Sequence, residues 1–216
     1  MLGRKIVREP DIKATVLTHL RKAGDISSKS VVANEYAVGR TSVRADLAIL
    51  QDEFIGVEIK SQYDSLRRLP RQLSVYRQFF DRTILVVAER HLSAALQFEL
   101  QGVELWVTQG AKIKPVWVDM SVFERRSLME LLTEAQRVRW SGRMEGKDRS
   151  AFVAEFNARF GPTSEAFWTA LGRRRATADD LSLLSRFRDL RIGQQRLLVE
   201  RAQNWSQWAV TESVAA

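Results

Sequence analysis

The amino-acid sequence predicts an α/β fold followed by an all-helical C-terminal region. Ile12, Val16 and Leu20 recur four residues apart, which is the spacing of one helix face. Short runs rich in β-branched and aromatic residues follow, and the run TILVVAE at 83–89 is continuously apolar, as in a buried strand. In the last third of the chain the strand-like runs end, and the apolar residues take the spacing of helices.

Helices and strands are expected to alternate along the first part of the chain. The expected strands are residues 31–38, 43–50, 54–60, 83–89, 103–108 and 114–119. The expected helices are residues 11–22, 64–79 and 91–100. The polar link at 51–53 is short, so the two strands that it joins should form an antiparallel hairpin. Pro70 lies inside the second helix and should break or kink it.

The change in pattern near residue 120 predicts an α/β domain over residues 1–120 and a helical region of unknown role over residues 121–216. A polar stretch at 141–150 should be a linker. The helices expected in this region are residues 121–140, 150–160, 164–174, 178–190 and 194–209.

Composition excludes several kinds of site. Hydrophobic residues make up 45% and charged residues 28% of the 216, so the chain should form a globular core. It has no cysteine, which excludes disulfides, cysteine catalysis and thiolate metal sites. Two histidines are too few for a histidine-rich zinc site, so any metal would be held mainly by carboxylates. No apolar run approaches the roughly 18 residues of a membrane span, and we expect a cytoplasmic protein.

The chain is basic, with a formal net charge of +8. A positive balance favours a polyanionic partner such as nucleic acid, although many basic proteins bind none. The excess is spread evenly, because residues 1–120 and residues 121–216 each carry a net charge of +4 by the counts of 18 minus 14 and 16 minus 12.

The most informative residues are Asp46, Glu58 and Lys60. Residues two apart on a strand face the same side, so Glu58 and Lys60 should project together while Ile59 points into the core. In a hairpin the start of one strand lies beside the end of the next, which brings Asp46 next to Glu58. Two carboxylates and an ammonium should therefore meet at one edge of the sheet.

Such a group suits phosphodiester chemistry. Adjacent carboxylates favour a cation between them, and oxygen ligands suit Mg²⁺ or Mn²⁺. A bound ion polarises a phosphoryl oxygen and lowers the pKa of a coordinated water. Lys60 would position the attacking water or offset charge on the phosphate, and the Ile59 carbonyl would be an additional metal ligand. The alternative is that Glu58 and Lys60 form an ordinary surface ion pair.

Asp46, eleven intervening residues, and then Glu58-Ile59-Lys60 resemble the motif of the PD-(D/E)XK nuclease superfamily. The resemblance covers roughly residues 10–120, and the chain departs from it in having Ala45 in place of the motif's proline. It implies a restriction-endonuclease-like αβββαβ core and a metal-dependent deoxyribonuclease, with Asp46, Glu58 and the Ile59 carbonyl on the metal and Lys60 as a catalytic residue.

The resemblance adds three further points. Glu35 best matches the upstream acidic residue, as a metal ligand or base. Gln72 and Tyr76 match the Gln-x-x-x-Tyr pair of RecB-like and lambda-exonuclease-like members, with Gln72 orienting the site. The stretch from Glu58 to Val87 also resembles uncharacterised bacterial and phage proteins with this core.

Several residues near the motif are candidates for contact with nucleic acid. Their positive charge or their position next to Lys60 would bring them to the backbone: Arg44, Ser61, Arg67, Arg68, Arg71 and Tyr76. The arginines and Tyr76 also have alternative roles. The arginines of residues 67–71 would also suit a solvated helix face. Arg44 would also suit an ion pair with an acid, and Tyr76 a place in the core.

The helical region offers weaker signals. Arginines at 173–175, with Arg186, Arg188 and Arg191, would form either a second phosphate-binding surface or ion pairs with Asp179, Asp180 and Asp189. Tryptophans in this region are expected in the core or an interface rather than stacked on bases, namely Trp140, Trp168, Trp205 and Trp208. His19 and His91 have no partner pattern.

Two other functional hypotheses accompany the nuclease. The first is a catalytically inactive nuclease-fold protein that binds nucleic acid or a protein partner, for example in conflict between phage and host. The second is an assembly role in which the helical region joins copies of the chain. A nuclease could also be a homodimer, because nuclease domains that cut both strands often pair. DNA is expected over RNA as the nucleic-acid partner.

Overall fold

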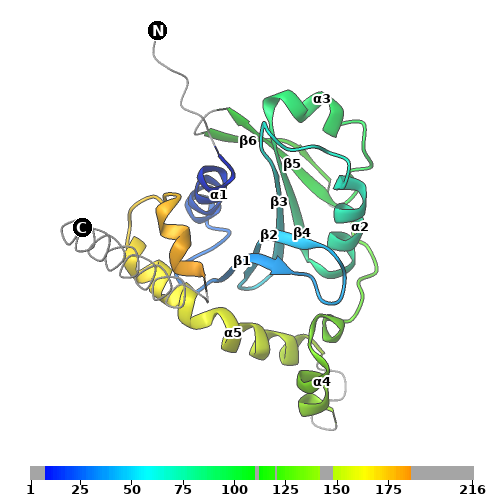
Figure 1. Cartoon of the computed structure of the whole chain (residues 1–216), viewed down its shortest axis with the longest axis vertical. Coiled ribbons are helices and arrows are strands. Elements are labelled where there is room, and N and C mark those ends of the chain that lie inside the picture. Colours follow the sequence, from blue (N-terminus) through cyan, green and yellow to red (C-terminus); the bar gives the residue numbers. More distant parts are fainter. Residues whose placement is uncertain (1–7, 110–111, 120, 142–147, 186–216) are drawn as a thin grey trace, which may run out of the picture. The chain divides into compact units, whose positions relative to one another are not determined.

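The computed structural model describes residues 8–109, 112–119, 121–141 and 148–185 (Figure 1). The chain divides into two compact units, Met1–Leu184 and Ser185–Ala216. Every element described below belongs to the first unit. The expected helix at 194–209 and the second half of the one at 178–190 lie outside the described residues.

A six-stranded mixed sheet forms the centre of this unit, with its strands in sequence order from β1 to β6. β1–β2, β2–β3 and β5–β6 are antiparallel, whereas β3–β4 and β4–β5 are parallel. The predicted α/β class and the predicted hairpin are confirmed. The strands are β1 (Val31–Ala37), β2 (Arg44–Leu50), β3 (Phe54–Lys60), β4 (Arg82–Ala88), β5 (Val103–Gln109) and β6 (Lys112–Val118).

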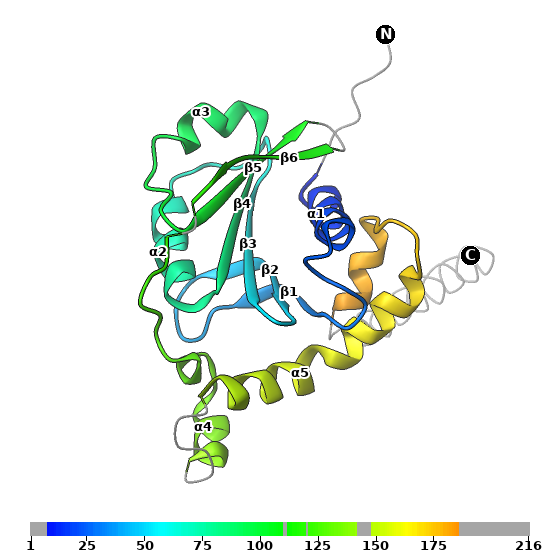
Figure 2. The same ribbon diagram turned by 180° about the vertical axis from the view of Figure 1, so that it is seen from behind.

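Helices cover both faces of the sheet (Figures 1 and 2). On one face, α1 (Glu9–Ala23) buries the predicted apolar stripe against alternate residues of the central strands. On the other, α2 (Leu69–Phe79) packs with the short α3 (Leu92–Ala95) over β4 and β5. Because every second residue of β3 faces α1, the residues between them face α2.

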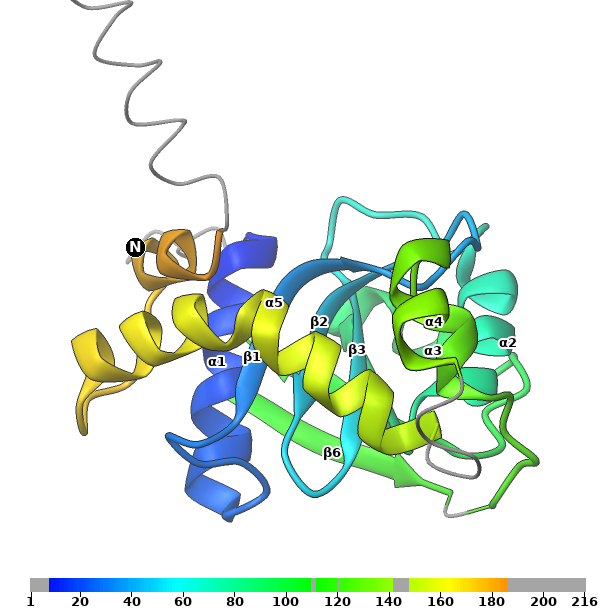
Figure 3. The same ribbon diagram turned by 90° about the horizontal axis from the view of Figure 1, so that it is seen from below.

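Helix α5 (Asp148–Leu171) extends the core along β1 (Figure 3). Its N-terminal half places Phe152, Phe156 and Phe160 against Phe54 and Tyr36. Its C-terminal half joins the cluster beneath α1, together with the 3₁₀ helix η3 (Asp179–Leu184). The compact unit therefore runs past residue 120, and α5 and η3, which the sequence places in a separate helical region, pack on β1.

Two predicted helices are shorter than expected. The helix expected at 64–79 begins only at Leu69, which places Pro70 in its first turn. Proline is tolerated there because the first backbone N–H groups of a helix have no intrahelical partner, so the predicted break or kink does not occur. The helix expected at 91–100 is reduced to α3, preceded by the 3₁₀ helix η1 (Glu89–His91).

The helices found after residue 120 differ more from the expected ones. The helix expected at 121–140 is a 3₁₀ turn η2 (Leu128–Leu131) followed by α4 (Glu134–Trp140). The two helices expected at 150–160 and 164–174 are one helix, α5, with Pro162 inside it. Aromatic residues on both sides of Pro162 are buried in the core, and their packing outweighs the roughly 3 kcal/mol that an internal proline costs.

Candidate functional site

The site begins where β2 and β3 separate. The ladder between these strands ends at the pair Leu47 and Val57. Beyond it, the backbone N–H of Ile59 donates to the Asp46 carboxylate over 2.6 Å instead of to a strand carbonyl. Asp46 therefore satisfies a backbone group that the diverging strands leave without a ladder partner, and this fixes its carboxylate beside the end of β3.

Glu58 and Lys60 lie at the end of β3 and face α2, as their spacing predicts. Lys60 Nζ is 2.6 Å from Glu58 Oε1 and 2.9 Å from Gln72 Oε1. The Gln72 amide donates to Glu58 Oε1 over 2.6 Å, and the Tyr76 hydroxyl donates to Glu58 Oε2 over 2.7 Å. Only 2% of Glu58 and 4% of Lys60 are exposed, so this ion pair is buried and not an ordinary surface pair.

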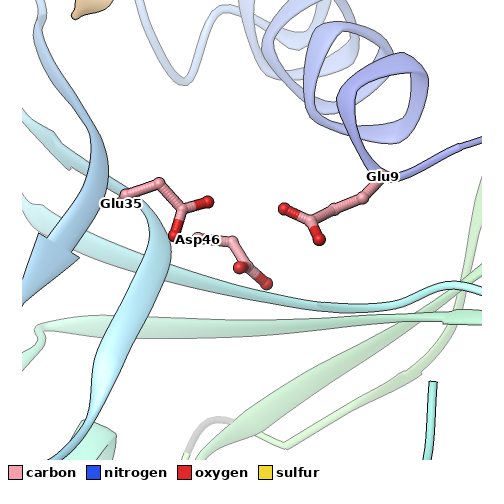
Figure 4. A group of neighbouring side chains, drawn as sticks. All are labelled: Glu9, Glu35 and Asp46. Atoms are coloured by element: carbon pink, nitrogen blue, oxygen red, sulfur yellow. The ribbon is translucent and has the colours of Figure 1, made fainter.

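Besides Glu58, three carboxylates gather on the side of the sheet that α1 covers (Figure 4). One oxygen from each of Glu9, Glu35 and Asp46 lies within 4.8 Å of the others. Glu9 comes from the first turn of α1, and Glu35 and Asp46 come from neighbouring positions on β1 and β2. Glu58 is not part of this acidic cluster, and its two oxygens are engaged with Lys60, Gln72 and Tyr76.

Glu35 reaches the cluster through an unusual backbone conformation. Its φ angle is +58°, the only positive value at a non-glycine residue in the described chain. The left-handed region costs an L-residue about 1–2 kcal/mol. Such strain persists only where the surroundings compensate for it, and here ion pairs with Lys13 and Arg44 hold the Glu35 side chain.

Glu9 and Lys13 are the two residues of this cluster that were not predicted from the sequence. Lys13 lies on α1, is 3% exposed, and its ammonium is 2.7 Å from Glu9 Oε1 and 3.9 Å from Asp46 Oδ1. It also donates to Glu35, and to Asn34 Oδ1 over 3.1 Å. Burial lowers the pKa of Lys13, but the carboxylates of Glu35 and Glu9 outweigh burial, so its pKa lies above 10.5.

The sequence contains signals for both Glu9 and Lys13. Pro10 and Asp11 are typical of a first helical turn, so α1 could have been started at Glu9 instead of residue 11. Lys13 is four residues after Glu9 and four before the buried Leu17, which places it on the core-facing side of the helix. A lysine at such a position indicates nearby carboxylates.

The environment of Asp46 disfavours its ionised form. Burial, and then the negative charge of Glu58, raise the pKa of Asp46 from 3.8 to about 8, while the Lys13 ammonium and the Ile59 N–H oppose the rise. Ionised Asp46 is therefore unfavourable in the folded protein without an additional cation. Carboxylates in this state are typical of sites that bind a cation or transfer a proton.

We expect Asp46→Asn to stabilise the metal-free protein, increasingly so as the pH rises. Between pH 4 and pH 8, folded Asp46 retains a proton that the unfolded chain has released, so the free energy of unfolding of the wild type falls as pH increases. The asparagine variant lacks this slope. Thermal unfolding in EDTA from pH 5 to 9, with exposed Asp52→Asn as control, measures it. A parallel pH profile for wild type and Asp46→Asn would contradict the assignment.

Arginines border the pocket that these groups share. The pocket is about 670 Å³, and its walls include Asp46, Glu58, Lys60, Arg68 and Arg71. Arg68 and Arg71 are exposed, and within the described part of the chain their guanidinium groups make no hydrogen bond or ion pair. Both are free to meet an anion entering the pocket.

The other two arginine candidates differ from this pair. Arg44 also lines the pocket, but its guanidinium is 2.8 Å from Glu35, which is the ion-pair alternative. Arg67 is exposed and does not line the pocket.

Two of the expected nucleic-acid contacts, Tyr76 and Ser61, are buried. Tyr76 is fully buried among apolar side chains, with its hydroxyl on Glu58, and burial, followed by the negative charge of Glu58, raises its pKa well above 10. Ser61 is 5% exposed and donates both its hydroxyl and its backbone N–H to Asp64. Both side chains therefore lie beneath the surface, where they hold Glu58 and Asp64.

The remaining candidates lie away from the pocket. Arg174 pairs with Asp180, as the ion-pair alternative supposed, and Arg173 and Arg175 are exposed. Trp168 is buried and donates to the Ser30 carbonyl, and Trp140 donates to Glu155. The other members of these two predicted sets lie outside the described residues: Arg186, Arg188, Asp189, Arg191, Trp205 and Trp208.

Comparison with known proteins supplies a family. The family model of bacteriophage P4 protein cII matches residues 4–141, which include the whole sheet and the acidic cluster. This chain belongs to that family. Protein cII of Enterobacteria phage P4 is 36% identical over 89 residues, which are 41% of this chain and 33% of that protein. The chain thus spans about a third of the length of this curated relative.

A solved structure is also similar to part of the cII-family chain. It is the SPO1766 protein of unknown function from Silicibacter pomeroyi, with 16% identity and a TM-score of 0.47. The similarity covers 77% of this chain and 96% of that one. Separately, none of the described helices combines the length and apolar composition needed to cross a membrane.

Proposed function

We propose that this chain is a metal-dependent nuclease that hydrolyses phosphodiester bonds in DNA, built on the restriction-endonuclease-like αβββαβ core of the PD-(D/E)XK superfamily. One observation carries the proposal: Asp46, Glu58 and Lys60 converge in one pocket at the point where β2 and β3 separate. The element order α1-β1-β2-β3-α2-β4 supports it, since it follows the order that the resemblance implies.

The donor set fits a hard divalent ion. Glu9, Glu35 and Asp46 offer carboxylate oxygens close to one another, and such oxygens suit Mg²⁺ or Mn²⁺. Glu9 joins the predicted ligands Asp46 and Glu35, and Glu58 and Ile59 line the same pocket. A bound ion would act as a Lewis acid on the phosphate and lower the pKa of a bound water.

Side chains of the protein would position the attacking water and the phosphate groups. Glu58 and Gln72 hold the Lys60 ammonium in one place, so it is preorganised to donate to the attacking water or to a phosphate oxygen. Tyr76 and Gln72 in turn fix Glu58, which keeps the pair aligned. Arg68 and Arg71 would bind neighbouring phosphates of the strand.

A cleavage assay tests this function. The purified protein would be incubated with supercoiled, linear and single-stranded DNA in Mg²⁺, Mn²⁺ or EDTA, beside Asp46→Asn and the exposed control Asp52→Asn. We expect cutting that requires the metal, persists in Asp52→Asn and is lost in Asp46→Asn. The absence of cutting on every substrate by a folded wild-type protein would refute the nuclease.

A second candidate is a DNA-binding protein of the same fold without catalysis. The observation that favours it is the buried Lys13 ammonium, which fills the acidic cluster with a cation of the protein's own. The exposed arginines at the pocket would then bind phosphate groups alone. Salt-dependent DNA binding that is unaffected by EDTA, together with no cleavage, would identify this function.

A further inference from the structure

Lys13 occupies an unusual place for a lysine. A buried ammonium needs compensating negative charge, and Lys13 has three carboxylates within 4 Å: Glu9, Glu35 and Asp46. These are the same three residues whose oxygens form the acidic cluster. The ammonium therefore lies within the group of oxygens that would hold a divalent ion.

The charges show why the two cations would compete. The three carboxylates carry a charge of −3 when ionised, and Lys13 reduces it to −2 without adding an oxygen ligand. A second cation within a few ångströms of Lys13 would meet direct repulsion, which is strong where water is scarce. Lys13 also engages one oxygen of Glu35 and one of Glu9, which leaves fewer carboxylate oxygens for a metal.

The side chain has the means to move. Lysine has a flexible four-carbon stem, and the pocket beside the cluster is about 670 Å³ and polar, with Asp64 and Glu58 on its walls. A displaced ammonium could therefore stay solvated near the site. Lys60 is a separate ammonium, held by Glu58 and Gln72 on the other side of β3.

We propose that Lys13 is the resident cation of the acidic cluster and must leave it before a divalent ion binds, so that Lys13 sets how much divalent ion the site requires. This inference rests on the proposed metal site, and it makes Lys13 a positioning residue. Its consequence is that Glu9 and Glu35 stay paired with Lys13 in the metal-free protein, while the affinity for metal is kept low.

The test measures Mn²⁺ affinity directly, from the loss of the free Mn²⁺ signal in electron paramagnetic resonance, without substrate. Wild type would be compared with Lys13→Met, with Lys13→Gln in case the methionine variant does not fold, and with Lys22→Met. Lys22 lies on the same helix and is exposed, so its replacement removes the same charge away from the cluster. A double variant, Lys13→Met with Glu35→Gln, shows whether any gain arises at the cluster.

We expect Lys13→Met or Lys13→Gln to bind Mn²⁺ at least about tenfold more tightly than wild type, and Lys22→Met to bind within about twofold of it. Adding Glu35→Gln should remove the gain. Equal or weaker binding by the folded Lys13 variants would overturn the inference, as would a gain that survives Glu35→Gln.

These outcomes are separate from the fate of the nuclease itself. Metal-dependent cleavage by wild type with no gain in the Lys13 variants would overturn only the role of Lys13. A gain in Mn²⁺ affinity without cleavage by wild type would uphold the role of Lys13 and reject the nuclease.

Discussion

Lys60→Met is expected to lower the rate of metal-dependent DNA cleavage by about 10²–10³-fold, the cost of removing one preorganised donor in an active site. Methionine keeps most of the length of the side chain but removes the ammonium that Glu58 and Gln72 hold in place. The loss should appear in the rate at saturating DNA, because the phosphate contacts that we propose for Arg68 and Arg71 would not depend on Lys60.

The control is Lys114→Met, which removes the same charge from an exposed position on β6. Because Lys60→Met leaves the Glu58 carboxylate buried without its cation, we also expect a lower melting temperature. Cleavage must therefore be compared well below both melting temperatures, with circular dichroism as the check on folding. Full activity of folded Lys60→Met would remove Lys60 from the proposed chemistry.

Phe156→Ala should reduce the free energy of unfolding by about 3–5 kcal/mol, the range for truncating a buried aromatic side chain. Phe156 is 3% exposed, and its ring centroid lies 4.8–5.5 Å from those of Phe160, Phe54, Tyr36 and Phe152. Few neighbours can fill the space that it leaves, because the surrounding rings also pack on one another. The melting temperature should fall by about 2–4 °C for each kcal/mol.

Val138→Ala is a suitable control, because Val138 is 63% exposed on α4 and its truncation should change stability little. Chemical denaturation measured by tryptophan fluorescence and by circular dichroism would give both free energies. A small effect for Phe156→Ala would mean that α5 is not an integral part of the core. Helix α5 begins at Asp148, beyond residues 4–141 that the cII family model matches. The result therefore tests whether the core extends past the matched residues.

The proposed function and the stability of the site are linked through Asp46. A protein optimised only for stability would not bury a carboxylate whose pKa is raised to about 8. Asp46→Asn is therefore expected to gain stability without metal and to lose cleavage, which is the usual trade-off at a functional site. Only a variant that does both fits the proposal.

The sequence by itself determined the parts of the site that local rules control. The period of two on a strand places Glu58 and Lys60 together, and the short 51–53 link makes the hairpin that brings up Asp46. The spacing of four on α2 places Gln72 and Tyr76 on one face of that helix. These arrangements depend only on neighbours in the chain, so they are readable without a structure.

Only the tertiary structure decided what depends on packing between distant segments. Glu9 and Lys13 meet Glu35 and Asp46 because α1 lies across the sheet, and no spacing along the chain specifies that distance. The burial of Tyr76 likewise follows from how α2 docks. The role of α5 follows from a core that its own aromatic residues complete, since burying them outweighs the local preference of Pro162 to end a helix.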